Sequence, residues 1–393
     1  MTNKLYWLEI NKKNIAYNIG NIKSILDPKT RLMVVVKSNA YGHGLVPFAK
    51  QAVFNGAEYL GVANIEEALI LRQEKIIKPI MVLGYVPIER IPEAAANYID
   101  IPIISPDYAV ALIRQKFLGK LKVHFKVDTG LNRMGISPAG ILNIFKELNK
   151  YKKIEIVGLY THLAAVEESN MDYTAGQFKM FGEVIRNLAK NNIEIPIKHV
   201  AASSAAFIFP ESHFDMVRMG IAGYGLWPSE ENRKSFFADA PPDIPKPFLR
   251  PILSYKTRVV EIKEVKSGYI GYGASFRITK PMRIAILPVG YFEGIARGLS
   301  CSSKKSKDSS GCGEVLISGI RCPIVGRICM NMTVVDVSKI PARNLRLLDE
   351  AVIIGRDGQE EITVEEIAAK LNTINYEITT RIPEHIERIY INE

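Results

Sequence analysis

Short apolar runs alternate with amphipathic segments between residues 32 and 220. The run from Leu32 to Val36 contains no polar residue, which is typical of a parallel strand buried on both faces. This pattern predicts eight strands, at residues 32–37, 59–64, 80–85, 101–105, 122–128, 155–162, 198–203 and 216–220. Helical periodicity, often with Pro near the first turn, predicts helices at 47–55, 65–74, 106–117, 138–148 and 172–189. We therefore expect an α/β fold with an N-terminal (β/α)8 barrel of the TIM type. No G-x-G-x-x-G motif follows a strand, which disfavours a doubly wound open sheet.

The pattern changes after residue 228. Residues 229–251 are rich in proline and charged side chains, which predicts a linker. Beyond it, apolar runs at 254–265, 268–276, 282–288, 314–317, 324–328, 333–337 and 351–354 are separated by turns. They predict a mostly antiparallel β domain, closed by a helix at 364–371 and a strand at 389–391. We expect residues 1–235 to form the barrel domain and 236–393 the β domain, with residues 1–10 pairing with the latter.

Composition restricts the choice of partners. The chain has 393 residues, 47% hydrophobic and 23% charged, and a net charge of +10. Its basic residues are spread out, and the densest cluster, at 304–307, lies in a Ser-rich stretch. That distribution indicates a solvated surface rather than a nucleic-acid groove. No apolar run approaches the length of a membrane span and no secretory leader precedes Trp7, so we expect a cytoplasmic protein without a nucleic-acid or membrane partner.

The cysteines indicate neither a metal site nor an extracellular framework. Cys301, Cys312, Cys322 and Cys329 lack the paired C-x-x-C spacing of a zinc site. We expect no metal, and four reduced thiols.

Candidate chemistry gathers where the predicted strands end. Lys37, His162 and Ser203 follow three strands and Arg218 lies in the last one, so a barrel would bring them to one rim. Each has an ordinary alternative: a snorkelling lysine, a structural histidine, an arginine in an ion pair. Together, a desolvated lysine suited to Schiff-base chemistry and a phosphate nest at Ser203 and Gly220 suggest pyridoxal phosphate.

Several motifs then resemble those of alanine racemase, a pyridoxal-phosphate enzyme of fold type III. The matching runs are VVKSNAYGHG from Val35 to Gly44, KVDTGLNRMG from Lys126 to Gly135, Thr161-His162, VRMGI from Val217 to Ile221, YGASF from Tyr272 to Phe276, Gly290-Tyr291, GRICM from Gly326 to Met330 and TINYE from Thr373 to Glu377. They occur in the family's order and extend over essentially the whole chain.

The resemblance implies a role for each matching residue. Lys37 would attach the cofactor covalently; Tyr41, Ser203, Gly220, Ile221 and Tyr376 would hold its phosphate; His162 would pack beside the pyridine ring and Arg218 would face the ring nitrogen. Lys37 and Tyr272 would be the two bases, on opposite faces of the substrate Cα. Arg133, Met330 and Tyr291 would contact the substrate, and Lys126 is a candidate for carbamylation. The implied assembly is a head-to-tail homodimer in which Tyr272 serves the site of the other subunit, and the implied role is supply of D-alanine for peptidoglycan.

The nature of Arg218 has a chemical consequence. A guanidinium only donates hydrogen bonds, so a pyridine nitrogen facing it stays unprotonated. The cofactor is then a weaker electron sink, which favours racemisation over transamination.

Some positions depart from the family pattern. Asn331 follows Met330 where Asp is usual, Ala202 stands where many relatives carry Asn, and the loop at 298–313 is longer than usual, which indicates a surface insertion. Three alternatives stay open: a broader racemase acting on serine or lysine, a non-catalytic pyridoxal-phosphate carrier built on the barrel alone, and a decarboxylase of the same fold type. The C-terminal domain argues against the carrier, and decarboxylase motifs are absent.

Overall fold

The computed structural model describes residues 4–168, 170–303 and 311–392. The chain divides into two compact units. One, the barrel unit, contains Lys13–Ala40 and Leu45–Pro251; the other, the C-terminal unit, contains the residues up to Lys12, Tyr41–Gly44 and the residues from Ile252 onward. The expected division at 235/236 stays a prediction.

The barrel unit is built on eight parallel strands, as predicted. They are β2 (Arg31–Val35), β3 (Tyr59–Val62), β4 (Ile80–Val82), β5 (Ile99–Ile103), β6 (Leu121–Lys126), β7 (Ile154–Tyr160), β8 (Ile197–His199) and β9 (Met216–Met219). Their order, β8-β7-β6-β5-β4-β3-β2-β9, is closed by a parallel bridge between Ala202 and Arg218. Large side chains fill one part of the interior, namely Met33, Tyr59, Met81, Tyr160, Ile197 and Met216. The barrel interior is therefore a packed core, and chemistry is confined to its rim.

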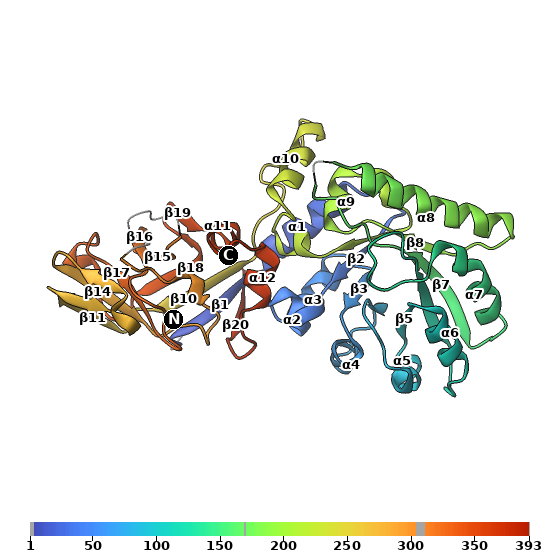
Figure 1. Ribbon diagram of the computed structural model, residues 1–393, viewed down its shortest axis with the longest axis horizontal. Helices are drawn as coiled ribbons and strands as arrows, with labels where there is room; N and C mark the ends of the chain where they lie inside the picture. The colour runs from blue at the N-terminus through green and yellow to red at the C-terminus, as the bar shows by residue number, and fades with distance from the viewer. Residues whose placement is uncertain (1–3, 169, 304–310, 393) are drawn as a thin grey trace. The chain divides into compact units, whose positions relative to one another are not determined.

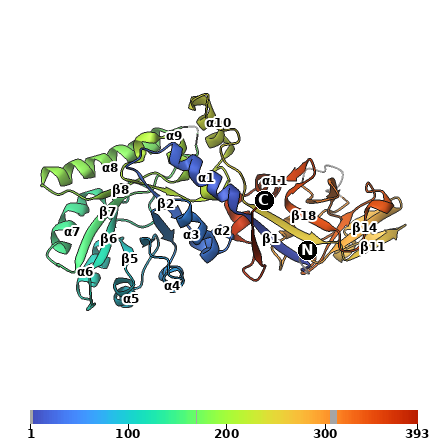
Figure 2. The same ribbon diagram turned by 180° about the vertical axis from the view of Figure 1, so that it is seen from behind.

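Helices surround these strands (Figures 1 and 2). They are α1 (Lys12–Ser24), α3 (Leu45–Phe54), α4 (Ile65–Gln73), α5 (Ile91–Ala96), α6 (Pro106–Ile113), α7 (Ile141–Leu148), α8 (Asp172–Lys190), α9 (Ser203–Ile208) and α10 (Glu230–Asp239).

Helix α10 corrects the prediction of a linker at 229–251. Ser229 caps its first turn, and Phe236 is buried against Trp227 and Phe248, so local capping and aromatic packing outweigh the polar composition.

The C-terminal unit is mostly antiparallel, also as predicted. Its strands are β1 (Tyr6–Asn11), β10 (Leu253–Arg258), β11 (Glu261–Val265), β12 (Gly268–Ile270), β13 (Phe276–Ile278), β14 (Met282–Leu287), β15 (Glu314–Ile317), β16 (Ile320–Pro323), β17 (Thr333–Asp336), β18 (Glu350–Asp357), β19 (Glu360–Ile362) and β20 (Arg388–Ile391). The largest sheet runs β16-β15-β18-β10-β1-β20, with β19 beside β18. Strand β1 pairs antiparallel with β10 and parallel with β20, so the start of the described chain lies inside this sheet.

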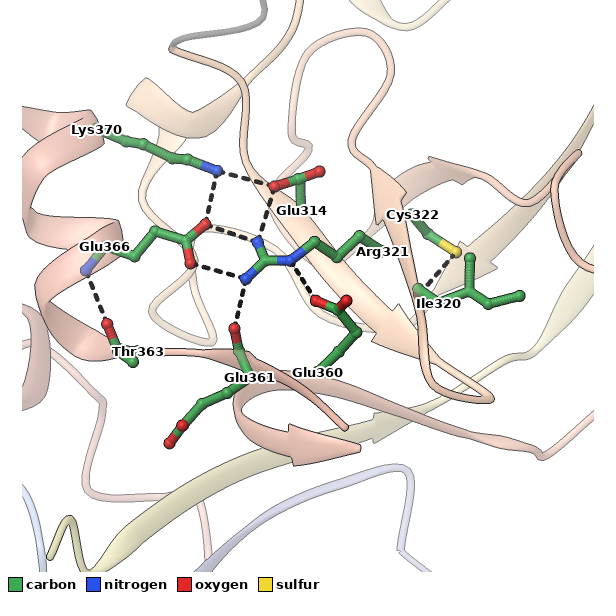
Figure 3. Close-up of polar contacts among 9 residues, drawn as sticks. All are labelled: Glu314, Ile320, Arg321, Cys322, Glu360, Glu361, Thr363, Glu366 and Lys370. Carbon is green, nitrogen blue, oxygen red and sulfur yellow. Dashed lines mark hydrogen bonds and ion pairs between the residues drawn. The ribbon is translucent and has the colours of Figure 1, made fainter. Parts of the chain in front are cut away.

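Helices α11 (Val364–Leu371) and α12 (Asn375–Thr380) complete this unit. Arg321 in β16 ties α11 to the strands (Figure 3). Its guanidinium contacts Glu366 of α11 at 2.9 Å, Glu360 at 2.9 Å and Glu314 at 3.1 Å, and Lys370 bridges Glu314 and Glu366. The Arg321 cluster, defined as these five residues, is a half-exposed structural ion-pair network.

The expectation of four reduced thiols is wrong in one respect. Cys301 and Cys312 form a disulfide, while Cys322 and Cys329 are free. Their spacing along the chain gave no sign of this pairing. Residues 304–310 of the predicted surface insertion, including its lysine cluster, lie outside the described residues.

Across the ranges described, no helix is both long enough and apolar enough to cross a membrane, and no group of three or more His, Cys, Asp or Glu residues could hold a metal ion.

Candidate active site

Lys37 lies two residues beyond the end of β2 and is partly buried at the rim of the barrel. Burial lowers the pKa of its amine, and the charge of Arg133 lowers it further, while Glu67 acts in the opposite direction. A lysine in such surroundings gives up its proton more readily than one in water, which suits a nucleophile and a base.

The backbone after Lys37 is strained. Four consecutive non-glycine residues, from Ser38 to Tyr41, have φ between 51° and 56°, in the left-handed region. Each costs roughly 1–2 kcal/mol. Glu67 of α4 compensates by accepting hydrogen bonds from the amides of Ser38 (2.6 Å) and Asn39 (3.3 Å), and the Asn39 side chain accepts one from the amide of Leu45. Strain retained in this way is a feature of functional sites.

Arg218 of β9 is 4% exposed. Its Nη1 donates to the carbonyl of His199 at 2.9 Å and lies 3.1 Å from Nδ1 of the same residue. Its Nη2 donates to the carbonyls of Thr161 and Val200, both at 2.8 Å, and lies 3.2 Å from Nδ1 of His162. Within the described part of the chain, Nε makes no hydrogen bond. The terminal nitrogens are therefore committed to the protein, and Nε–H is the donor left for a ligand.

His162 follows β7 and is held by this arginine. Because the guanidinium only donates, Nδ1 of His162 must accept, and Nε2 carries the proton. Burial, followed by the charge of Arg218, lowers the pKa of His162 to about 3. The imidazole is thus neutral, with one N–H available for donation.

The predicted phosphate contacts of the barrel are neighbours. Ser203 opens α9, and its hydroxyl accepts a hydrogen bond from the amide of Gly220 at 3.0 Å. Ile221 follows in the short 3-10 turn Ile221–Tyr224. Ala202 precedes Ser203 and offers no capping side chain, as its small size predicts.

Lys126 ends β6 and is 3% exposed. Burial, with the nearby charges of Arg133 and Arg218, lowers its pKa to about 8. Its amine makes no hydrogen bond or ion pair in the described ranges and lies 5.7 Å from the centre of the Tyr160 ring. Arg133 itself is exposed, on a loop shaped by the Asp128 carboxylate, which accepts hydrogen bonds from the amides of Gly130 and Asn132.

The rim therefore gathers four cations, namely Lys37, Lys126, Arg133 and Arg218. Their mutual repulsion, which lowers the pKa of both lysines, favours bound anions.

The C-terminal unit holds the other predicted residues. Tyr41 is buried and its ring lies 6.1 Å from that of Tyr376, so these two expected phosphate contacts are together. Tyr272 opens a 3-10 turn between Gly271 (φ 76°) and Gly273 (φ 69°) and is 69% exposed. Glycine is required at both positions by the left-handed backbone.

Tyr291 and Met330 also lie side by side. The amide of Tyr291 donates to the carbonyl of Cys329, and that of Phe292 donates to the carbonyl of Met330. Glu293, which is buried, accepts hydrogen bonds from the side-chain amide of Asn331 (2.7 Å) and from the backbone of Gly290 (2.8 Å). The departure at Asn331 thus has a local reason: an aspartate there would face a buried carboxylate.

Comparison with known proteins agrees with this arrangement. Residues 10–228 match the family description "Alanine racemase, N-terminal domain" and residues 252–390 match "Alanine racemase, C-terminal domain". The chain belongs to the alanine racemase family. Alanine racemases are pyridoxal-phosphate-dependent isomerases, and this chain is one of that class.

Individual alanine racemases are similar over their full length. That of Methanococcus maripaludis is 40% identical and covers 98% of this chain and 98% of its own length. That of Leptospira interrogans is 38% identical and covers 98% of this chain and 96% of its own length. Two solved structures share the fold. The alanine racemase of Clostridium difficile matches with a TM-score of 0.89 and 33% identity, over 100% of this chain and 97% of that one. The alanine racemase of Bacillus anthracis with bound L-Ala-P matches with a TM-score of 0.87 and 34% identity, over 100% of this chain and 96% of that one.

The residues present fit the cofactor of the alanine racemase family. The rim offers an amine of lowered pKa, a free guanidinium N–H and a serine hydroxyl beside a backbone amide, which match an aldehyde, a ring nitrogen and a phosphate.

Four residues near this site escaped the sequence analysis: Glu67, Asp100, His124 and His199. His124 and His199 are polar residues inside predicted barrel strands, where apolar side chains are the rule, and that mismatch was the available signal; Asp100 directly precedes the strand predicted at 101–105 and lies within β5 in the structure.

Proposed function

We propose that this chain interconverts L-alanine and D-alanine with pyridoxal phosphate, through a base on each face of the substrate Cα. The observation that carries the proposal is the combination of Lys37 on a strained turn and Arg218 with one free donor at the same barrel rim. Barrel enzymes keep their chemistry at this end of the strands.

Lys37 would attach the cofactor, and Ser203, Gly220 and Ile221, with Tyr41 and Tyr376, would hold its phosphate. Arg218 would donate from Nε to the ring nitrogen, and His162 would pack against the ring. When bound, the cofactor supplies the electron-withdrawing group that makes the Cα–H of an amino acid acidic.

Lys37 would serve as one base once substrate has displaced it from the cofactor. Burial lowers its pKa, which increases the share of neutral amine, the form in which Nζ can accept a proton from Cα and return it. The guanidinium of Arg218 is always protonated and only donates hydrogen bonds, so a ring nitrogen facing it would have to accept one and would stay unprotonated.

Tyr272 would serve as the other base. Its strong exposure in the single chain is consistent with a side chain that reaches another molecule, so we propose a head-to-tail homodimer in which Tyr272 of one subunit enters the site of the other. The N–H of His162 is a suitable donor to its phenolate.

Arg133 would bind the substrate carboxylate, with Met330 and Tyr291 completing the pocket. A pKa of about 8 leaves part of the Lys126 amine neutral, the form that reacts with carbon dioxide. A carbamate there would replace one of four crowded cations by an anion that can orient Arg133. Mass analysis of gently prepared protein tests this: one added carbon dioxide mapped to Lys126 supports it, and an unmodified peptide contradicts it.

The activity is tested by incubating purified, cofactor-loaded protein with L-alanine and measuring the enantiomers. We expect D-alanine to accumulate towards an equal mixture, and Lys37→Ala to abolish this. No D-alanine from wild-type protein would contradict the proposal; turnover of serine or lysine instead would indicate the broader racemase. A cytoplasmic location and supply of D-alanine for peptidoglycan stay predictions.

A further inference from the structure

A chain of buried polar side chains continues from Arg218 into the barrel. Nδ1 of His199 lies 3.1 Å from Arg218 Nη1, and Nε2 of His199 lies 3.1 Å from Nδ1 of His124. Nε2 of His124 lies 3.4 Å from Oδ2 of Asp100, which also accepts the hydroxyl proton of Tyr59 at 2.5 Å. The chain of contacts crosses five strands of one unit, from β9 through β8, β6 and β5 to β3.

The chemistry of arginine gives this chain a direction. Arg218 only donates, so Nδ1 of His199 accepts and its proton sits on Nε2. That N–H donates to Nδ1 of His124, whose own proton then sits on Nε2 and points to Asp100. Each imidazole is therefore held in the Nε2–H form, and Asp100 is the terminal acceptor.

Charge balance points the same way. Arg218 is a fully buried cation, and among the described residues it makes no ion pair. A buried charge without compensation is strongly unfavourable. Of the carboxylates in the described ranges, only Asp100 and Glu293 are buried, and Glu293 belongs to the other unit. Asp100 is thus a buried anion that continuous hydrogen bonds through His124 and His199 link to this arginine.

The strand backbone accommodates this series of hydrogen-bonded side chains. The β6–β7 register shifts between Val123 and His124, and such an irregularity re-aims the side chain that follows it. Gly158 of β7 lies opposite, and a Cβ there would come within 1.8 Å of Nδ1 of His124. On the other side, Tyr160 stacks on His199 with ring centres 4.7 Å apart. The strand geometry and a missing side chain keep these imidazoles in line.

We propose that Asp100 is a positioning residue for racemisation: acting through His124 and His199, it orients the Arg218 guanidinium and balances its charge. The proposal rests on the proposed function, in which Nε of Arg218 faces the cofactor ring. Asp100 itself touches neither cofactor nor substrate.

The first test is the tautomer of each histidine, read from ¹⁵N shifts of the full-length protein labelled at its six histidines. We expect Nε2–H forms for His124 and His199 in the wild type. In Asp100→Asn the side-chain amide can present N–H to Nε2 of His124, so we expect the Nδ1–H form of His124 to appear, while Arg218 still holds Nδ1 of His199 as an acceptor. An unchanged tautomer of His124 in this variant would overturn the proposal.

The second test compares Asp100→Asn with Tyr59→Phe in the cofactor-loaded enzyme. Each substitution removes a polar group from the same buried cluster, but only Asp100→Asn alters the hydrogen bonds that lead through His124 and His199 to Arg218. For Asp100→Asn we expect kcat to fall about tenfold, the value of one charge-assisted hydrogen bond, with KM changed less than about twofold. Tyr59→Phe should keep kcat within about twofold while lowering the melting temperature. Equal losses of kcat would show a merely structural cluster and overturn the proposal.

Should Asp100→Asn fail to fold, His124→Gln interrupts the same series of hydrogen bonds one residue nearer to Arg218, and the comparison of kcat with Tyr59→Phe decides. If wild-type protein does not racemise alanine, the proposed function fails, yet the tautomers still test the chain of hydrogen bonds by themselves.

Discussion

Arg218 in the barrel unit and Arg321 in the C-terminal unit are both held by many hydrogen bonds, but the accepting groups differ. Arg321 meets the carboxylates of Glu314, Glu360 and Glu366 (Figure 3), and these raise its pKa. Arg218 meets three carbonyls and two neutral imidazoles, and burial lowers its pKa to about 10.

The difference teaches how a fold separates structural from functional charge. The charge of Arg321 is neutralised within the protein by carboxylates, and these ion pairs join a helix to a sheet. The charge of Arg218 is held in place by groups that do not neutralise it directly, so it stays available to a ligand at Nε. Glu293 is the counterpart with opposite sign, a buried carboxylate held by the neutral donors Asn331 and Gly290.

Replacing each arginine by lysine tests whether one charge is functional and the other structural, and we expect the largest effect at Arg218. Lysine keeps a positive charge but loses the planar set of donors, so Arg218→Lys should lower kcat by about 100-fold, as for removal of one preorganised donor. Enantiomer formation from L-alanine measures this. A kcat close to that of the wild type would mean that charge alone, and not directed donation, is what the site uses.

Asn331→Asp should have the next largest effect. It places a second carboxylate against Glu293, which is buried, and should lower the free energy of unfolding by about 2 kcal/mol. Urea unfolding measures the loss. The double variant Asn331→Asp with Glu293→Gln should recover most of it, because a neutral amide again meets the carboxylate; no recovery would contradict the pairing.

Acid distinguishes the two arginine sites through His162. Its folded pKa of about 3 lies below the usual 6.5, so the unfolded chain takes up a proton first as pH falls. Its contribution to stability is complete above pH 6.5 and declines by about 1.4 kcal/mol per pH unit below it. The pKa of Glu366 in the Arg321 cluster is also lowered, but from 4.5, so that contribution is lost only below about that pH.

Unfolding at pH 7.0 and 5.5 is the corresponding measurement. We expect the barrel unit to weaken over this interval while the Arg321 cluster does not. We expect His162→Asn to remove part of the pH dependence, because burial also lowers the pKa of His199 and of His213. An equal slope in that variant would show that other groups cause it.

Arg321→Lys should have the smallest effect. The cluster is partly exposed to solvent, so its ion pairs are weak, and loss of the fork geometry should lower the unfolding free energy by less than about 1 kcal/mol with kcat unchanged. A loss of activity comparable to that of Arg218→Lys would erase the contrast between the two sites.

Much of this arrangement was predictable from the chain, because its signals are local. The apolar runs identified the eight barrel strands, and helix 364–371 was predicted to the residue. The motifs also indicated which unit carries Lys37, Ser203 and Arg218, and the structure places these residues together at the strand ends, although their roles remain proposals.

The remainder depends on contacts between distant positions. His124 pairs with Asp100 and His199, which lie 24 and 75 residues away along the chain, and no local pattern encodes such partners. The left-handed turn after Lys37 needs Glu67 from another helix. The disulfide between Cys301 and Cys312 and the burial of Phe236 in α10 likewise depend on where the folded chain returns.

The place of β1 has a consequence for biosynthesis. The ribosome makes this strand before all the barrel strands, yet its two neighbours, β10 and β20, follow the barrel strands. The central sheet of the C-terminal unit therefore cannot close until β20 has emerged, whereas all barrel strands are available long before. We expect a nascent chain in which a folded barrel waits with one unpaired strand, so that fusions or deletions at residues 6–11 would disturb the late step of assembly rather than the first.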